Sequence, residues 1–158
     1  MNSIEISVNK TLKLQNVISK TMDLSNDNPG SFDLEINKMN TYIMTHGAKQ
    51  IGPLIQYTGV DLNEKNEMNF ELKFMLQCDK YLHSSDKDYP MEPTIRVTDC
   101  LYARYKGPES KVKFAFDKIG VYAFENDIEL QGSNYTIYVS KNVEEETMVA
   151  DIFMPIKK

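Results

Sequence analysis

A pattern of apolar residues recurs in this chain at a spacing of 80 residues, and it constrains the fold more than any other feature. Residues 32–46 and 112–126 each carry an apolar stripe at helical spacing. The matching pairs are Phe32 and Val112, Ile36 and Phe116, Met39 and Ile119, Ile43 and Ala123, and, off the stripe, Leu34 and Phe114, and Tyr42 and Tyr122. Residue identity is low, so a pattern is repeated and not a sequence. Two such units in 158 residues predict a pseudo-symmetric body with a central cleft between them.

Strand patterns surround both helical stripes and give the order β-α-β-β twice. The predicted strands are Thr11–Leu24, Gln50–Leu62, Met68–Cys78, Thr94–Tyr105, Tyr135–Ser140 and Met148–Ile156. The predicted helices span residues 31–46 and 109–126. Phe70, Leu72 and Phe74 alternate with polar residues, which indicates an antiparallel sheet with one buried face. We therefore expect an α+β fold, an antiparallel sheet with both helices on one face.

Turn and cap residues mark the boundaries between these elements. Ser31 is predicted to cap the first helix at its start, and Gly47 to end it after His46. The segment Lys106-Gly107-Pro108 is predicted to end the fourth strand. One domain, residues 1–158, is expected, with repeat one at about 6–79, a linker at about 80–93 and repeat two at about 94–158.

Composition excludes several classes of protein. The net charge of −5 and the absence of a Lys/Arg cluster argue against nucleic-acid binding. No apolar run approaches the roughly 20 residues that cross a bilayer, and the N-terminus does not read as a signal peptide, so a cytoplasmic protein is expected. Cys78 and Cys100 lack CxxC spacing and are interpreted as small buried or half-buried side chains, with a disulfide or a redox role as the alternative.

No motif for catalysis or for a cofactor is present. His46 and His83 have no partners at metal-ligand spacing, and Asp86 and Asp88 lack the rest of a calcium loop, so no metal is predicted. The sequence therefore favours a binding protein over an enzyme.

Several short segments carry a family resemblance. They are Leu101–Pro108, Tyr135–Val139, Asp151–Ile156 and Gly52–Tyr57. With the duplicated β-α-β-β layout, they resemble the gyrase-inhibitor-like (GyrI-like), AraC-type bacterial effector-binding domains. A second resemblance is to an uncharacterised family of Gram-positive bacteria found near type VII secretion genes.

The resemblance implies a binding role for the cleft. Members of the GyrI-like superfamily bind amphipathic or cationic small molecules there, or bind proteins, and some hydrolyse small electrophiles. The two small-molecule roles commonly use a glutamate just before a tyrosine of the penultimate strand. Thr136, two residues before Tyr138, stands at the matching position here, which counts against cation binding and hydrolysis.

Tyrosines are the main candidates for the walls of the cleft, since aromatic side chains suit amphipathic ligands and protein partners alike. The predicted cleft residues are Tyr57, Glu71, Tyr102, Tyr105, Tyr122, Thr136 and Tyr138. Glu71 is the fallback for an acid. The alternative is that the tyrosines are core residues.

Apolar side chains on the outward helix faces are a second lead. Leu34, Phe114 and Val121 project away from the buried stripes, and Phe124 enlarges the patch. They indicate a partner interface or a homodimer surface, or else the rim of a broad core.

The sequence thus predicts a non-catalytic binding protein, first a protein-partner adaptor or chaperone, and second a sensor or sequestering protein for a small amphipathic ligand. Hydrolysis is a distant third.

Overall fold

The computed structural model describes residues 4–22, 30–62, 64–83 and 86–157. Its elements are β1 (Ile6–Thr21), α1 (Gly30–Thr45), β2 (Gln50–Leu62), β3 (Met68–Cys78), β4 (Met91–Pro108), η1 (Glu109–Lys111), α2 (Lys113–Glu125), β5 (Asn134–Asn142) and β6 (Thr147–Pro155). This order is the predicted duplicated β-α-β-β order, and the pairs β1–β3, β2–β3, β4–β6 and β5–β6 are antiparallel, so the α+β fold class is confirmed.

The chain divides into two compact units. The central unit comprises residues 13–96, and the terminal unit comprises residues 1–12 and 97–158. Both boundaries fall inside long strands, because β1 and β4 each contribute residues to both units. The boundaries between units therefore differ from the predicted linker at 80–93, whose last residues already belong to β4.

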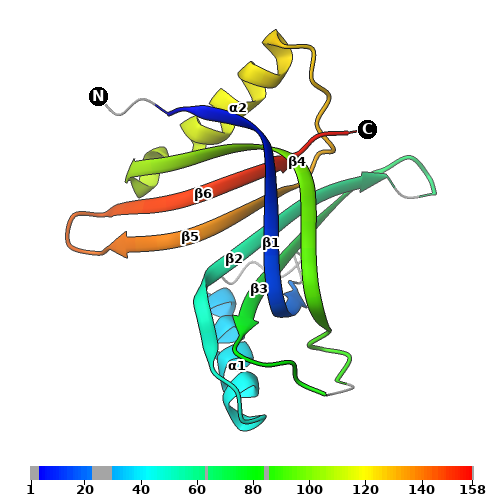
Figure 1. Ribbon diagram of the computed structural model, residues 1–158, viewed down its shortest axis with the longest axis vertical. Helices are drawn as coiled ribbons and strands as arrows, with labels where there is room; N and C mark the ends of the chain where they lie inside the picture. Colours follow the sequence, from blue (N-terminus) through cyan, green and yellow to red (C-terminus); the bar gives the residue numbers. More distant parts are fainter. Residues whose placement is uncertain (1–3, 23–29, 63, 84–85, 158) are drawn as a thin grey trace. The chain divides into compact units, whose positions relative to one another are not determined.

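In the central unit, β3 pairs with β1 on one side and with β2 on the other (Figure 1). Helix α1 packs against this sheet through the fully buried Met39 and Ile43, which contact a core containing Ile18 and Leu76. The predicted alternation of β3 is interrupted, because Met75 is buried as well as Phe74.

The terminal unit repeats this arrangement, with β6 paired to both β4 and β5. Helix α2 buries Ala115, Ile119 and Ala123 against a core that includes Leu101 and Ile152. Both predicted helical stripes thus face the cores of their own units. Burying a stripe of this kind is the main source of helix stability in a protein.

The duplication extends to backbone conformations. Residues with positive φ recur at matched places in the two units. Three pairs follow the 80-residue spacing: Gly47 and Asp127, Gly52 and Gly132, and Asn66 and Glu146. Asn16 and Asp99 match by their place in the sheets, since each directly precedes the first residue of β1 or β4 that pairs with β3 or β6. Positive φ is uncommon outside glycine, although Asn and Asp adopt it more readily than other residues. The two copies therefore keep the same bends with different side chains.

The helix ends show the same equivalence. The backbone N–H of Ala48 donates to Ile43 at 3.1 Å, and that of Ile128 donates to Ala123 at 2.8 Å. The predicted C-terminal cap at Gly47 is confirmed, with φ of 78°, although α1 ends at Thr45 and not at His46.

Several predicted boundaries are wrong. β1 begins at Ile6 and not at Thr11, because Ile6 packs on the core of the terminal unit. The alternation of Ile4, Ile6 and Val8 with polar residues is the sequence signal for this earlier start. The segment Lys106-Gly107-Pro108 does not end β4 but pairs with residues 147–149 of β6. The ring of Tyr105 lies over Gly107, where a Cβ atom would approach the hydroxyl to 3.0 Å, so this glycine serves close packing within a strand.

The helix starts differ as well. A short 3-10 helix, η1, occupies the predicted first turn of the second helix, and α2 begins at Lys113. Helix α1 begins at Gly30, and the side chain of the predicted cap Ser31 lies outside the described residues.

Candidate ligand-binding site

The sheet of the terminal unit has one face against α2 and an opposite face, which we call the far face. On β4, Leu101 and Ala103 are fully buried in the core beneath α2. Because side chains alternate along a strand, Tyr102 and Arg104 point to the far face. The register places Phe153 opposite Tyr102 and Asp151 opposite Arg104, so these two residues of β6 share that face.

Three of these side chains form a hydrogen-bonded cluster around the Asp151 carboxylate. The Tyr102 hydroxyl donates to Oδ1 at 2.7 Å. The Arg104 guanidinium donates twice, from Nε to Oδ1 at 2.7 Å and from Nη2 to Oδ2 at 2.9 Å. Charge-assisted, bidentate hydrogen bonds of this kind are among the stronger and more directional ones in proteins. The carboxylate is therefore held in one orientation.

Burial and hydrogen bonding act in opposite directions on this carboxyl. Partial burial raises the pKa of Asp151, while the hydrogen bonds from Arg104 and Tyr102 and the charge of Arg104 lower it, with a net pKa below the ordinary value. Burial and the hydrogen bond to Asp151 raise the pKa of Tyr102, which keeps its hydroxyl protonated as a donor. The cluster therefore holds an ionised carboxylate at neutral pH.

Aromatic rings flank the cluster on the far face. The rings of Tyr102 and Phe153 lie 4.9 Å apart between centroids at an interplanar angle of 43°. Tyr135 of β5 pairs with Phe153 in register and so lies on the same face. An ionised acid beside aromatic rings is a surface suited to an amphipathic cation.

The equivalent positions of the central unit show that the fold itself does not require this cluster. Counting from the matched residues Asn16 and Asp99, Thr21 corresponds to Arg104. The register pairs Thr21 with Lys73, just as it pairs Arg104 with Asp151. The same place in the same sheet thus carries a threonine and a lysine in one copy, and an arginine and an aspartate in the other.

The predicted cleft residues fall into three groups. Tyr102 belongs to the cluster. Tyr105, Tyr122 and Tyr138 belong to the α2 side of the terminal unit, where Tyr105 is a buried core residue whose hydroxyl donates to the Pro108 carbonyl. Thr136 is also on that side, because it is only 3% exposed and pairs with the core residue Ile152. An acid at position 136 would face the α2 core, so Thr136 does not determine the charge of the far face.

Tyr57 and Glu71 belong to the central unit. The Tyr57 ring lies over Gly59, and the ammonium group of Lys73 lies 5.6 Å from the centroid of that ring. Lys73 also pairs with Glu71 at 3.1 Å. Glu71 is therefore an acid with a neighbouring cation on its own strand.

Sequence reasoning missed Asp151 and Arg104. The signal was a lone acid within the apolar strand Met148–Ile156, since a half-buried charge in such a strand needs a partner. The partner could not be named, because Arg104 lies 47 residues away and only the register of β4 and β6 brings the two together.

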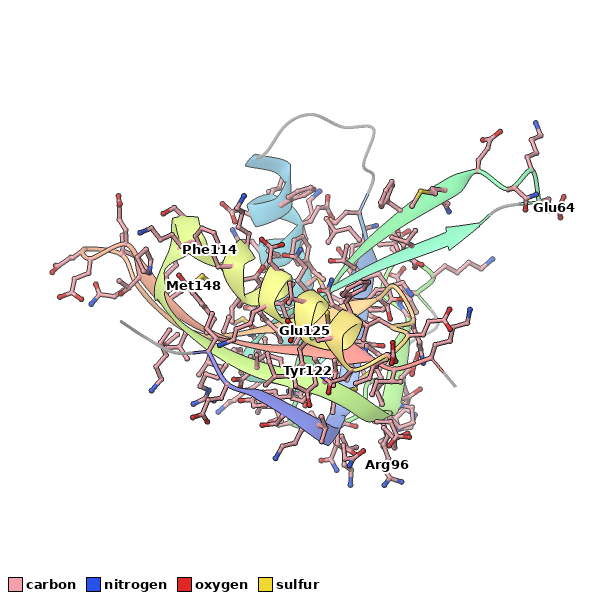
Figure 2. The ribbon with its side chains drawn as sticks, turned by 90° about the horizontal axis from the view of Figure 1, so that it is seen from above. Glu64, Arg96, Phe114, Tyr122, Glu125 and Met148 are labelled. Atoms are coloured by element: carbon pink, nitrogen blue, oxygen red, sulfur yellow. The ribbon has the colours of Figure 1, made fainter. Side chains whose placement is uncertain are left out.

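The predicted interface residues are exposed. Phe114 is 53%, Val121 54% and Phe124 85% exposed along α2, and Leu34 of α1 is 53% exposed. Figure 2 shows Phe114 and Glu125 at the two ends of α2. We call Phe114, Val121 and Phe124 the α2 patch.

Cysteines and histidines are the other reactive groups that the structure describes. Cys78 and Cys100 are fully buried free thiols, and burial together with Asp79 raises the pKa of Cys78 to about 11. Nδ1 of His46 lies 2.8 Å from the Tyr42 carbonyl oxygen at the end of α1. Among the residues that the structure describes, no three His, Cys, Asp or Glu side chains are arranged to hold a metal ion.

A hollow of about 400 Å³ lies at the β5–β6 turn and is lined by Pro108, Glu109, Ser110, Glu145 and Glu146. All five residues are exposed, so charges there stay hydrated and contribute little to binding. The far-face cluster is the stronger candidate because its carboxylate is held and partly buried.

No helix within the described ranges is long and apolar enough to span a membrane. No family model matches the sequence, and no curated protein gives a match.

Solved structures do match, over nearly the whole chain. The C-terminal domain of EcmrR is 17% identical, with 98% of each chain covered and a TM-score of 0.68. EcmrR in its DNA complex is 18% identical with a TM-score of 0.70, and this chain spans only 58% of its length. SAV2435 bound to tetraphenylphosphonium is 11% identical, with 99% and 94% coverage and a TM-score of 0.53.

A hydrolase from Listeria innocua is also 11% identical, with 98% and 91% coverage and a TM-score of 0.55. The predicted link to type VII secretion finds no support in these matches. At such identities the matches establish a shared fold, which is the fold predicted from the resemblance to GyrI-like effector-binding domains.

Proposed function

We propose that this protein is a non-catalytic binding protein for small amphipathic cations, and that the far face of the terminal unit contributes the recognition surface. The observation that carries the proposal is the Asp151 carboxylate, 14% exposed, on a sheet face with Tyr102 and Phe153. A partly buried acid attracts a cation, and aromatic rings accept the apolar body around the charge. The central unit carries Lys73 at the equivalent place, so the acid is not a requirement of the fold.

The relatives in fold support the same chemical class. SAV2435 was solved with tetraphenylphosphonium, a cation whose charge is surrounded by aromatic rings. EcmrR carries the fold as the C-terminal domain of a protein that binds DNA. A small-molecule sensor built on this fold is therefore favoured over the adaptor role that the sequence alone placed first.

The state of Asp151 favours binding over hydrolysis. A general acid or base works best when its pKa lies near the working pH. The pKa of Asp151 is lowered by Arg104 and Tyr102, so at neutral pH it neither releases nor takes up a proton readily. A fixed ionised carboxylate suits a counter-charge for a ligand.

Tetraphenylphosphonium is the first probe for this site. We expect it to raise the melting temperature of the wild-type protein, because a ligand at 100 times its dissociation constant adds about 2.7 kcal/mol to folding stability. Asp151→Asn should reduce the affinity at least about tenfold, which corresponds to roughly 1.4 kcal/mol. A thermal-shift titration measures both effects.

Asp117→Asn is the matched control, since it removes the same charge from an exposed position on α2. It should leave the affinity unchanged. Equal binding by the wild-type protein and Asp151→Asn would show that the far face is not the site, and no stabilisation of the wild-type protein by hydrophobic cations would count against the ligand class itself.

A protein partner is the second candidate function, and the α2 patch is the observation that favours it. Three large apolar side chains on one helix, each at least half exposed, form a surface of the kind used in protein contacts. The adaptor, chaperone and homodimer roles predicted from the sequence all require such a surface.

Charged substitutions in the α2 patch test this second function. Phe114→Glu and Val121→Lys should abolish recovery of a specific partner in a pull-down, while circular dichroism shows an unchanged fold. Leu34→Glu, on the helix of the other unit, shows whether α1 belongs to the same interface. Full recovery with both α2 variants would exclude the α2 patch as the interface.

A further inference from the structure

We infer that Arg104 is a resident counter-ion that occupies the place of the ligand's cationic group on Asp151, so that a ligand binds by displacing it. The inference rests on the proposed function and concerns how the same site selects its ligands. It starts from a feature that a simple acid pocket lacks, namely that both carboxylate oxygens of Asp151 already accept hydrogen bonds from a guanidinium.

The two members of the ion pair differ in exposure. The side chain of Arg104 is 46% exposed, whereas that of Asp151 is 14% exposed. The guanidinium of Arg104 can therefore rotate into solvent, while the less exposed carboxylate of Asp151 stays in place. Separation of the pair leaves the carboxylate without its counter-charge, which is costly for a partly buried group, so the exchange requires a ligand that brings its own cation to Asp151.

The carboxylate keeps its orientation when the arginine leaves. The hydroxyl of Tyr102 also donates to Oδ1, and Tyr102 is itself packed against the ring of Phe153. Displacement thus exposes a fixed acceptor beside two aromatic rings. The site changes from neutral to negative only when the guanidinium moves away.

This arrangement sets the specificity of the site. A small, strongly hydrated cation gains only the contact with the carboxylate, and Arg104 already makes that contact through two hydrogen bonds from within the chain. A cation with an apolar body gains the aromatic contacts as well, and only this gain drives the exchange. Arg104 therefore excludes simple cations and admits amphipathic ones.

Four proteins test the inference by isothermal titration with tetraphenylphosphonium chloride: the wild type, Arg104→Gln, Asp151→Asn and the double variant. Arg104→Gln should bind about threefold to tenfold more tightly than the wild type, because nothing competes for the carboxylate. Asp151→Asn and the double variant should both bind weakly, because both lack the carboxylate. Methylammonium, a small and strongly hydrated cation, should bind Arg104→Gln more tightly than the wild type.

Arg96→Gln is the matched control. Arg96 is the other arginine of the chain, is also on β4, and is exposed, as Figure 2 shows for its labelled side chain. Its replacement removes the same charge and should leave the affinity unchanged. If Arg104→Gln does not fold, Arg104→Lys serves instead, and it should bind more tightly than the wild type because an ammonium group holds the carboxylate less firmly.

The outcomes separate this inference from the proposed function. If the wild type binds and Asp151→Asn does not, but Arg104→Gln binds no more tightly than the wild type, the counter-ion role is overturned while the proposed site stands. Weaker binding by Arg104→Gln overturns it as well and makes Arg104 a direct ligand contact. If no protein of the set binds the cation, the proposed function and the inference both fail.

Discussion

Ile43→Ala and Ile119→Ala are each expected to lower the free energy of unfolding by about 2–5 kcal/mol, the usual range for deleting a buried isoleucine side chain down to alanine. Both side chains are fully buried, Ile43 beneath α1 and Ile119 beneath α2. Each anchors the helix of its own unit, so the two substitutions delete the same side chain from the two helix cores, although in the repeat Ile119 matches Met39 and Ile43 matches Ala123. Urea unfolding followed by circular dichroism measures the loss.

The comparison of these two variants also tests the predicted single domain. Strands β1 and β4 run without a break through both unit boundaries. A strand cannot stay paired in one unit while it unfolds in the other without losing its regular structure at the junction. We therefore expect one cooperative transition in both variants, shifted as a whole.

Val143→Ala is the control for this pair, since Val143 is 76% exposed and its truncation should change the stability by no more than about 0.5 kcal/mol. Two separate transitions, with only one of them shifted in each variant, would mean that the units fold independently and that the chain is not one domain in the thermodynamic sense.

The second large effect is a pH-dependent loss of stability at Asp151. Asp151→Asn should destabilise the protein by about 1.5–3 kcal/mol at pH 7, the range for hydrogen bonds to a charged group. The folded-state pKa of Asp151 is lowered, so its contribution is fully present above the unfolded pKa of about 3.9 and is lost as the pH falls through the lower folded value. The difference between wild type and variant should therefore vanish at low pH.

Urea unfolding of both proteins at pH 7, 4 and 2.5 measures this difference. Asp117→Asn, at an exposed position, should show no stability difference from the wild type at any of these values. A destabilisation by Asp151→Asn that is as large at pH 2.5 as at pH 7 would assign the effect to packing of the new amide and not to the ionised carboxylate.

The sequence predicts the fold correctly where the bounds of an element depend on local residue patterns alone. The bounds of β2 and β3 were predicted correctly, because alternating strands flank a strongly polar turn. The long strands were not, because β4 continues through Gly107 and Pro108, which are usually breakers. That continuation depends on pairing with β6 and on the ring of Tyr105 over Gly107, neither of which is a local property.

The site was only partly accessible. Tyr102 was predicted as a binding residue, but its partners Arg104 and Asp151 were not, since their contact depends on a register between strands far apart in the chain. Thr136 was given a role by analogy, whereas the alternation of β5 turns it towards Ile152 and the core. Sequence patterns thus predict the strands, but only the register between strands shows which charged side chains lie next to each other.

The matched residues of positive φ bear on how internal structural repeats are detected. Gly47 and Asp127, or Asn66 and Glu146, would count as mismatches in any alignment that compares letters. In the backbone, however, both members of each pair adopt the same left-handed conformation at the same place in the unit. A comparison that scored the sign of φ at each residue would therefore find the two halves of this chain alike at positions where their side chains differ.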